Sequence, residues 1–329
     1  MSWLRYIARL VAFTFFFVIC AKALQAQDVT LRYKWTKGDV VRYRLTMQQS
    51  GSVVSLPQAV AALGALQGIS IDQKTTHTIR MDVDEVSADG TITLREVVEA
   101  VRFERNMPAI GGATGEAVFD TANGDKASTP SQMAIASVVG EPITILMSSN
   151  GAVQKVDGIS RVLDKLAETF PSNVAGQLNA LKESLNDQTM AAFMTLAPFP
   201  ERALKSGDTW DRERNIAMPM IGKLTTSETF TFQGVEDNVA HIKLNTKGKQ
   251  DSVSPLSLPN GSMQVHLEDS SGEGDSLFDV AKGRMQRSNS STTGTMTMNM
   301  AVSLPNGDNP QNLSITMKTT SSTLMEPIP

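Results

Sequence analysis

The sequence has one cysteine, three histidines and few aromatic residues, which make up 5% of its 329 positions. Cys20 lies in an apolar N-terminal stretch, so the chain after it can form no disulfide and offers no thiolate nucleophile. Metal sites need several His, Cys or carboxylate ligands at short spacings, and His77, His241 and His266 are isolated from one another. We therefore expect no metal and no cofactor, and stability must come from an apolar core.

Charge is sparse as well. The chain carries 30 Lys and Arg against 34 Asp and Glu, a net charge of −4 that becomes −7 once Arg5, Arg9 and Lys22 leave with a signal peptide. An acidic chain lacks the basic surface that nucleic-acid binding requires, so we expect no nucleic-acid partner. The hydrophobic fraction of 41% indicates a folded protein and excludes a disordered one.

Residues 1–26 have the order of a secretory signal peptide. Arg5 and Arg9 precede an uncharged stretch of 12 residues that ends at Lys22, and small residues follow up to Gln27. This stretch is shorter than the roughly 20 residues that a helix needs to cross a bilayer. We therefore expect an exported, periplasmic protein whose mature chain contains no integral membrane span.

The cleavage site has two candidates in the sequence, after Ala23 and after Ala26, and the second is preferred. Lipoprotein processing needs a small residue before the lipidated cysteine, but bulky Ile19 precedes Cys20. We therefore do not expect anchoring through lipidation of Cys20.

Most of the remaining sequence alternates between apolar and polar residues, which is the pattern of half-buried strands. The pattern runs through residues 40–48 and 77–83 and resumes after the turn at residues 88–90. Further hairpins are predicted around Ser149-Asn150-Gly151 and around residues 236–238. Long strands joined by tight turns predict an antiparallel sheet.

The periodicity becomes helical between residues 158 and 197. Ile159, Leu163 and Leu166 belong to one apolar stripe along a helix that should end before Pro171, and Asp187 is a predicted N-cap for a later helix. We predict a mainly β (α+β) fold with a curved sheet or half-barrel and a helical block packed against it. Its parts are residues 1–26 (signal peptide), 27–157 (N-terminal β-rich half), 158–197 (helical block) and 198–329 (C-terminal β-rich half).

The two strand-rich parts echo one another. Lys37-Gly38-Asp39 corresponds to Ser206-Gly207-Asp208, and a Phe-Asp pair followed by glycine occurs at residues 119–124 and 278–283. These matches predict an internal duplication into two related halves. The alternative is that such turns recur by chance in any antiparallel protein.

At these residues the chain resembles an uncharacterised family of exported bacterial proteins, many of them lipoproteins. The resemblance lies in Leu31-Arg32-Tyr33, Ser149-Asn150-Gly151, Val156-Asp157-Gly158 and the stretch from Phe199-Pro200 to Gly207-Asp208-Thr209-Trp210. It covers most of the mature chain and implies a bacterial exported protein of shared fold. It implies no activity and no catalytic residues.

No catalytic pattern is present. The sequence lacks a nucleophile elbow, a Ser-x-x-Lys pair in suitable context and a phosphate-binding glycine loop, so we expect a protein that is not an enzyme. Asp269 to Asp275 carries oxygen side chains at alternate positions, the ligand type that calcium prefers. A solvated strand end with a glycine turn is the preferred interpretation of this segment, and calcium binding is the alternative.

Two features suggest contact with an apolar ligand. Residues 45–71 contain no charge, and their centre could cover a cavity or dock on a membrane or partner. The preferred interpretation is a helix packed in the core. Methionines recur on one predicted strand face, and flexible thioethers suit both variable ligands and irregular cores. The candidate ligand contacts are Val60, Leu63, Leu66, Met296, Met298, Met300 and Met317.

The sequence therefore favours a non-catalytic periplasmic protein that binds an apolar ligand such as a lipid. The first alternative is an envelope protein that acts through protein–protein contacts, with strand edges or residues 45–71 as the docking surface. The second is a hydrolase whose site is assembled from dispersed residues.

Overall fold

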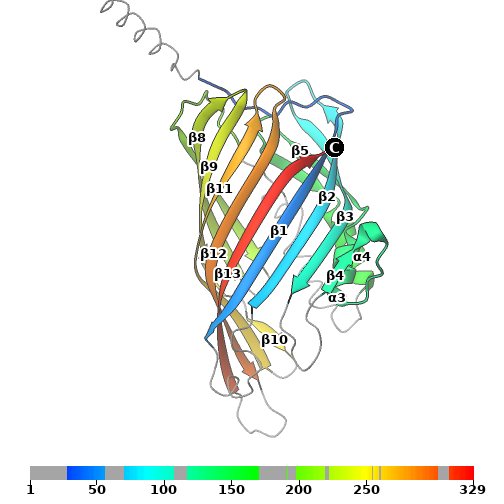
Figure 1. Cartoon of the computed structure of the whole chain (residues 1–329), viewed down its shortest axis with the longest axis vertical. Helices are drawn as coiled ribbons and strands as arrows, with labels where there is room; N and C mark the ends of the chain where they lie inside the picture. Colours follow the sequence, from blue (N-terminus) through cyan, green and yellow to red (C-terminus); the bar gives the residue numbers. More distant parts are fainter. Residues whose placement is uncertain are drawn as a thin grey trace, which may run out of the picture.

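A computed structural model describes residues 28–55, 70–106, 117–169, 191, 198–218, 222–253, 255–258, 261–302 and 311–329. Thirteen strands form one antiparallel sheet (Figure 1). They are β1 (Val40–Ser55), β2 (Ser70–Val86), β3 (Ile92–Asn106), β4 (Ala117–Asp120), β5 (Pro142–Met147), β6 (Val153–Asp157), β7 (Thr209–Met218), β8 (Gly222–Glu236), β9 (Val239–Gln250), β10 (Leu256–Leu258), β11 (Gly261–Asp279), β12 (Arg284–Val302) and β13 (Gln311–Ile328). The described helices are the 3₁₀ helix η2 (Thr121–Asn123), α3 (Pro130–Ser137) and α4 (Ile159–Thr169).

The strand order shows how one chain makes one sheet. It runs β6-β5-β3-β2-β1-β13-β12-β11-β9-β8-β7, with β4 added to β3 and β10 added to β11. The first and last strands pair in the middle, from Arg42 opposite Ile328 onwards. The two edges, β6 and β7, flank the helical block in sequence. The two strand-rich parts of the chain therefore form the two sides of a single sheet.

The predicted hairpins are confirmed. Gly90 and Gly151 have φ of 83° and 93° in the turns between β2 and β3 and between β5 and β6. Asp237 and Asn238, with φ of 48° and 64°, join β8 to β9 in a two-residue turn. Such positive values match the right-handed twist of the flanking strands, which is why glycine and asparagine mark these positions in the sequence.

The sheet is strongly curved and not closed, which confirms the predicted fold class. Buried side chains from distant strands, among them Leu94 of β3, Ile145 of β5, Phe232 of β8 and Phe278 of β11, share one core cluster. Strands this far apart in the order can contact one cluster only if the sheet curls around it. We call the face that carries this cluster the inner face, and the opposite one the outer face.

Two segments outside the strands cover one end of the inner face. Residues 28–36 and 198–206, here called the closing segments, are joined by two backbone hydrogen bonds of 3.0 and 2.8 Å between Val29 and Leu204. Leu31 and Leu204 are fully buried in the core cluster. The closing segments reach the β5–β6 turn through the amides of Tyr33 and Phe199, which donate to its carbonyl oxygens. We call this end of the sheet, where the C-terminus lies (Figure 1), the closed end.

The described part of the helical block packs on the inner face beside the sheet edge. Ile159 and Leu163 of α4 are buried against Val156 of β6 and against Ala191, which is also helical. Ile143 of β5 contacts both this cluster and the main core. The helix predicted to begin at Ile159 is therefore confirmed over residues 159–169. Its expected end before Pro171 and the N-cap at Asp187 lie outside the described residues.

The turns that enter β1 and β7 have the same hydrogen bonds. The amide of Gly38 donates to Val83 of β2 over 2.9 Å, and the amide of Gly207 donates to Phe232 of β8 over 2.7 Å. In both turns an aspartate side chain accepts from the backbone amide three residues earlier. The glycine φ values are 88° and 90°. The echo seen in the sequence therefore extends to local structure, and the internal duplication itself stays a prediction.

A candidate ligand-binding face inside the curved sheet

The inner face is divided along the strands into zones of different polarity. Antiparallel partners share a face, so each row of paired residues can be followed across the sheet. At the closed end the rows are aromatic and aliphatic, and they form the core cluster. The middle of the inner face is polar, and the opposite end is rich in methionine. The outer face carries most of the charged side chains of the same strands.

The sequence predicts that methionines recur on one strand face, and in the structure they do lie on one face. Met325 packs against the core, and Met317 lies eight residues earlier on the same uninterrupted strand, so both point to the inner face. Met296 is paired with Met317, and Met298 and Met300 follow on β12. We call this zone the methionine surface; it consists of Met296, Met298, Met300, Met317, Val265, Leu313 and Ile315.

The methionine surface is only partly covered. Its four methionines, together with Leu313 and Ile315, are half-buried, whereas Val265 is buried. Of the other candidate ligand contacts, Val60, Leu63 and Leu66 lie outside the described residues. The described ends of the uncharged segment are strands, because residues 45–55 belong to β1 and residues 70–71 to β2.

A polar belt crosses the inner face between the core and the methionine surface. It is a single row of paired residues from β3 to β7 with no apolar side chain. Its members are Arg105, Gln73, Gln49, Ser321, Thr292, Gly272, Thr246, Glu228 and Arg212. Gln49 and Ser321 are exposed, and neighbouring Met47 is 38% exposed. The belt is therefore accessible in its middle.

A buried ion cluster ends the belt at the β7 edge. The Nε of Arg212 donates to Glu228 over 2.6 Å, and Arg214 binds the other oxygen of the same carboxylate. The side chain of Glu228 is only 3% exposed. Burial lowers the pKa of Arg212, while the charge of Glu228 acts to raise it. Arg212 also lies 5.6 Å from the ring centre of Phe230, which stacks on Trp210. Both arginines at this end of the belt are therefore already paired with a carboxylate.

The other end of the belt is different. Arg105 of β3 has a buried Nε without a hydrogen-bond partner, and it forms no ion pair with any described residue. Its neighbour in the row is the amide side chain of Gln73. The two ends together carry Arg105, Arg212 and Arg214 against the single carboxylate of Glu228, so the belt region has an excess of positive charge.

Two titratable side chains lie closer to the closed end. Glu96 of β3 is placed between Met81 and Ile143 in the neighbouring strands, and burial raises the pKa of its carboxyl to about 7. Burial lowers the pKa of His77, whose Nε2 has no hydrogen-bond partner. An inward-facing carboxyl without a donor is thus disfavoured in its charged form.

Glycines occupy the inner face where the polar belt meets the methionine surface. Gly51, Gly248 and Gly294 belong to one row, and Gly272 lies in the belt itself. A Cβ added to Gly272 would lie 2.6 Å from the carbonyl oxygen of Ser291. These positions therefore leave backbone without side chains on the inner face, which allows close approach by a neighbouring strand or a ligand.

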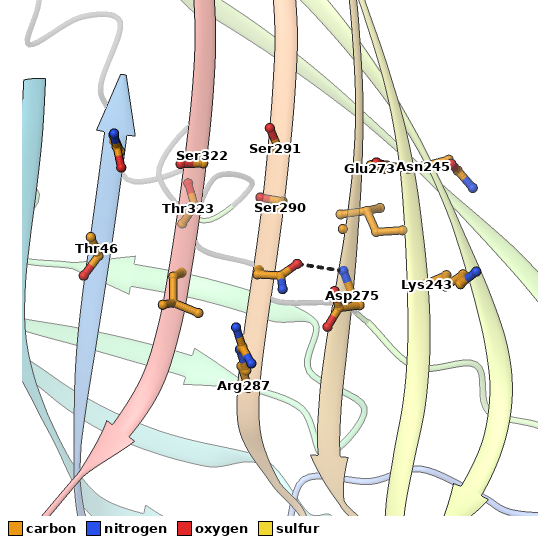
Figure 2. A pocket seen from close by; sticks show the side chains of 15 residues that line it. Thr46, Lys243, Asn245, Glu273, Asp275, Arg287, Ser290, Ser291, Ser322 and Thr323 are labelled. Carbon is orange, nitrogen blue, oxygen red and sulfur yellow. Dashed lines mark hydrogen bonds between the residues drawn. The ribbon is translucent and has the colours of Figure 1, made fainter. Parts of the chain in front are cut away.

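A separate groove of about 660 Å³ lies on the outer face across β1, β13, β12, β11 and β9. Figure 2 shows its polar side chains, among them Lys243, Asp275 and Arg287. Asn289 accepts a 3.2 Å hydrogen bond from the backbone amide of Asp275. The groove is lined by charges of both signs and by no aromatic ring, so it favours no one ligand class.

The calcium hypothesis gains no geometric support from the strand. The glycine turn predicted here is wrong, because residues 269–275 lie within β11 and pair continuously with β9. Ser271, Glu273 and Asp275 follow one another along its outer face rather than surrounding a point. Among the described residues, no three His, Cys, Asp or Glu side chains gather closely enough to hold a metal ion. No helix in the described ranges has the length and apolar character needed to span a membrane.

The sequence contains a signal for the polar belt in the two residues at its ends. Arg105 continues the apolar register of Val101 and Phe103, and Glu228 precedes Phe230 and Phe232 in the same way. A charged residue in an apolar register indicates an inward-facing charge. The alternation within each strand does not show that Arg105 and Glu228 share one row, because that row depends on strand pairing across the sheet.

The fold and the zones of its inner face define a class: an open, curved antiparallel sheet with a polar and an apolar region inside. The family model described as a family of unknown function, DUF6263, matches residues 100–319, and the chain belongs to that family. No curated protein matches the sequence significantly.

Lipovitellin and an outer membrane channel are among the solved structures to which this chain is similar. Lipovitellin, from a structure described as showing lipid–protein interactions, has a TM-score of 0.46 and 8% identity, covering 90% of this chain. The chain spans only 26% of the length of that lipovitellin chain. An outer membrane channel from Pseudomonas putida F1 has a TM-score of 0.24 and 5% identity, with 90% of this chain and 97% of the channel covered.

Proposed function

We propose that this protein is a non-catalytic binding protein of the bacterial envelope that holds an apolar ligand, such as a lipid, on the inner face of its sheet. The methionine surface carries the proposal. Half-buried thioethers and aliphatic side chains lie together on a concave face, where apolar ligands gain most from leaving water. Methionine adapts its shape to different tails because its side chain is unbranched and flexible.

Export is part of this proposal. The sequence of residues 1–26 supports secretion, and cleavage after Ala26 would leave a mature chain that begins at Gln27. N-terminal sequencing of the protein from the periplasmic fraction tests this step. A mature chain that begins at Cys20 would instead show lipoprotein processing.

Native mass spectrometry of protein isolated gently from the periplasm, followed by solvent extraction, tests the binding function. We expect a reproducible excess mass that extracts as lipid. A clean mass of the protein alone would contradict the proposal and favour a role through protein contacts.

A matched pair of variants assigns the bound mass to the methionine surface. Met298→Ser combined with Met300→Ser should lower occupancy, because it removes apolar contact on the inner face. Asn299→Ser changes the outer face of the same strand and should leave occupancy unchanged. Equal occupancy in both variants would place the ligand elsewhere.

A further inference from the structure

One positive charge of the polar belt has no partner within the described residues. Arg105 lies on the inner face of β3, and its Nε is buried without a hydrogen bond. Arg102, on the outer face of the same strand, pairs with Glu104 over 2.6 Å and with Asp120 over 3.2 Å. A charge held in a partly buried place without a counter-charge is costly unless something else compensates it.

The rest of the inner face does not supply that compensation. Glu228 is already shared by Arg212 and Arg214. Glu96, the other acidic residue that the described strands place on the inner face, lies nine positions before Arg105 on β3, or about 30 Å along the strand. Charge complementarity therefore favours an anionic ligand at the belt.

The belt also offers room and hydrogen-bond donors beside Arg105. Gln73 is paired with Arg105, and Gln49 and Ser321 are the next residues in the row. Gln49 and Ser321 are exposed although they point inward, so none of the described residues covers them. Amide and hydroxyl groups next to a guanidinium are suited to the oxygens of a phosphate or carboxylate.

The belt continues into the methionine surface along β12 and β13. From Thr292 in the belt, Met296 lies about 13 Å along the strand and Met300 about 26 Å. The row between the polar belt and the methionine surface includes Gly294 and Gly51, which have no side chains. Arg105 lies three strand spacings from Ser321, or about 14 Å across the sheet. A head group held between Arg105 and Gln49 is therefore about 14 Å from Met317, which lies four positions before Ser321 on the neighbouring strand.

We propose that the polar belt binds the anionic head group, a phosphate or a carboxylate, of a single-chain amphiphile whose tail lies on the methionine surface. Arg105 binds the head group through its guanidinium, and Gln73 and Gln49 donate further hydrogen bonds. The inference rests on the proposed function, because it specifies the chemical class of the ligand held on the same face.

Isothermal titration of the mature protein with three probes tests the inference. Dodecyl phosphate carries both the tail and the anion, dodecanol carries the tail alone, and inorganic phosphate carries the anion alone. We expect dodecyl phosphate to bind about tenfold or more tightly than dodecanol, since hydrogen bonds to a charged group are worth at least that factor. Inorganic phosphate at millimolar concentration should compete weakly.

Variants assign the preference to Arg105. Arg105→Gln should reduce the advantage of dodecyl phosphate over dodecanol about tenfold while dodecanol binding stays unchanged. Arg105→Lys keeps the charge and should retain part of the preference, which also guards against a variant that fails to fold. Arg102→Gln removes an arginine from the outer face of the same strand and should leave the preference intact.

The possible outcomes distinguish the head-group site from the proposed binding of an apolar ligand. Equal binding of dodecyl phosphate and dodecanol would overturn the head-group site and leave the apolar-ligand function standing. If neither amphiphile binds, both ideas fail. If inorganic phosphate binds as tightly as dodecyl phosphate, the belt is a site for a free anion, and the amphiphile is the wrong ligand. A preference that survives Arg105→Gln would also overturn the assignment.

Discussion

The ring of Tyr33 stacks on the ring of Phe199, with centroids 5.3 Å apart and planes inclined by 22°. Phe278 of β11 meets both rings edge-on, at 5.3 and 4.8 Å. The three rings come from the two closing segments and the sheet, so this contact joins parts of the chain that lie far apart in sequence. The closed end of the inner face therefore depends on aromatic packing.

Replacing Phe199 should destabilise the whole domain. Phe199→Ala removes a fully buried ring and leaves a cavity, which we expect to cost about 3–5 kcal/mol in the free energy of unfolding measured with urea. Tyr33→Phe is the matched control. It removes a buried hydroxyl that has no hydrogen-bond partner, so it should cost less than about 0.5 kcal/mol or stabilise. A small cost for Phe199→Ala would mean that the closing segments detach independently of the sheet.

The ion cluster at the β7 edge gives a second prediction. Glu228→Gln leaves Arg212 and Arg214 in a buried place without their shared carboxylate, and we expect a loss of about 3–5 kcal/mol in the free energy of unfolding. Glu213→Gln changes an exposed carboxylate on the outer face of β7, between Arg212 and Arg214, and should stay within about 0.5 kcal/mol. Equal small losses in both variants would show that water reaches the Glu228 cluster.

Local features of this fold could be predicted from the sequence, and non-local ones could not. The turns at Gly90 and Gly151 and the start of α4 at Ile159 are specified by neighbouring residues. The pairing of β1 with β13 joins residues that are almost 300 positions apart, such as Arg42 and Ile328. No local sequence pattern specifies which distant strands pair. Periodicity alone predicts that the four methionines share a face, because β12 and β13 are regular strands. It does not predict that Arg105 and Glu228 lie in the same row, because that row depends on how the strands pair.

The turns that enter β1 and β7 have the same hydrogen bonds, and glycine substitutions test whether they also contribute equally to stability. Gly38 and Gly207 have φ of 88° and 90°, and a Cβ added at either position would meet no atom within 4 Å. Substitution by alanine should therefore cost only the strain of the left-handed backbone, about 1–2 kcal/mol, and the same at both sites. Urea unfolding of Gly38→Ala and Gly207→Ala measures this. Costs that differ by more than about 1 kcal/mol would contradict the equivalence.

Gly283 differs from Gly38 and Gly207 because a side chain at its position would meet a neighbouring segment. Its φ is 61°, and an added Cβ would lie 2.4 Å from the backbone nitrogen of Lys34, which donates a 3.1 Å hydrogen bond to Gly283. Gly283→Ala must therefore displace a closing segment as well as strain the turn, and we expect it to cost more than Gly38→Ala in the same urea experiment. A cost no larger than that of Gly38→Ala would show that the closing segment shifts freely.

Glu96 predicts a distinctive pH dependence. Burial raises the pKa of its carboxyl from 4.5 to about 7, so the folded state binds this proton more tightly than the unfolded state. Its contribution to stability is fully present below about pH 4.5 and is lost as the pH rises towards about 7, by at most about 3 kcal/mol. His77 acts in the opposite direction, because burial lowers its pKa and favours the neutral ring in the folded state.

A Glu96→Gln variant tests this pH dependence. Because it retains His77, the difference in unfolding free energy between the variant and the unchanged protein reports on the Glu96 carboxyl alone. That difference, measured with urea from pH 4.5 to 8, should shift steadily in favour of the variant up to about pH 7. If it stays constant over this range, the carboxyl is hydrated and the inner face beside β5 is open to water.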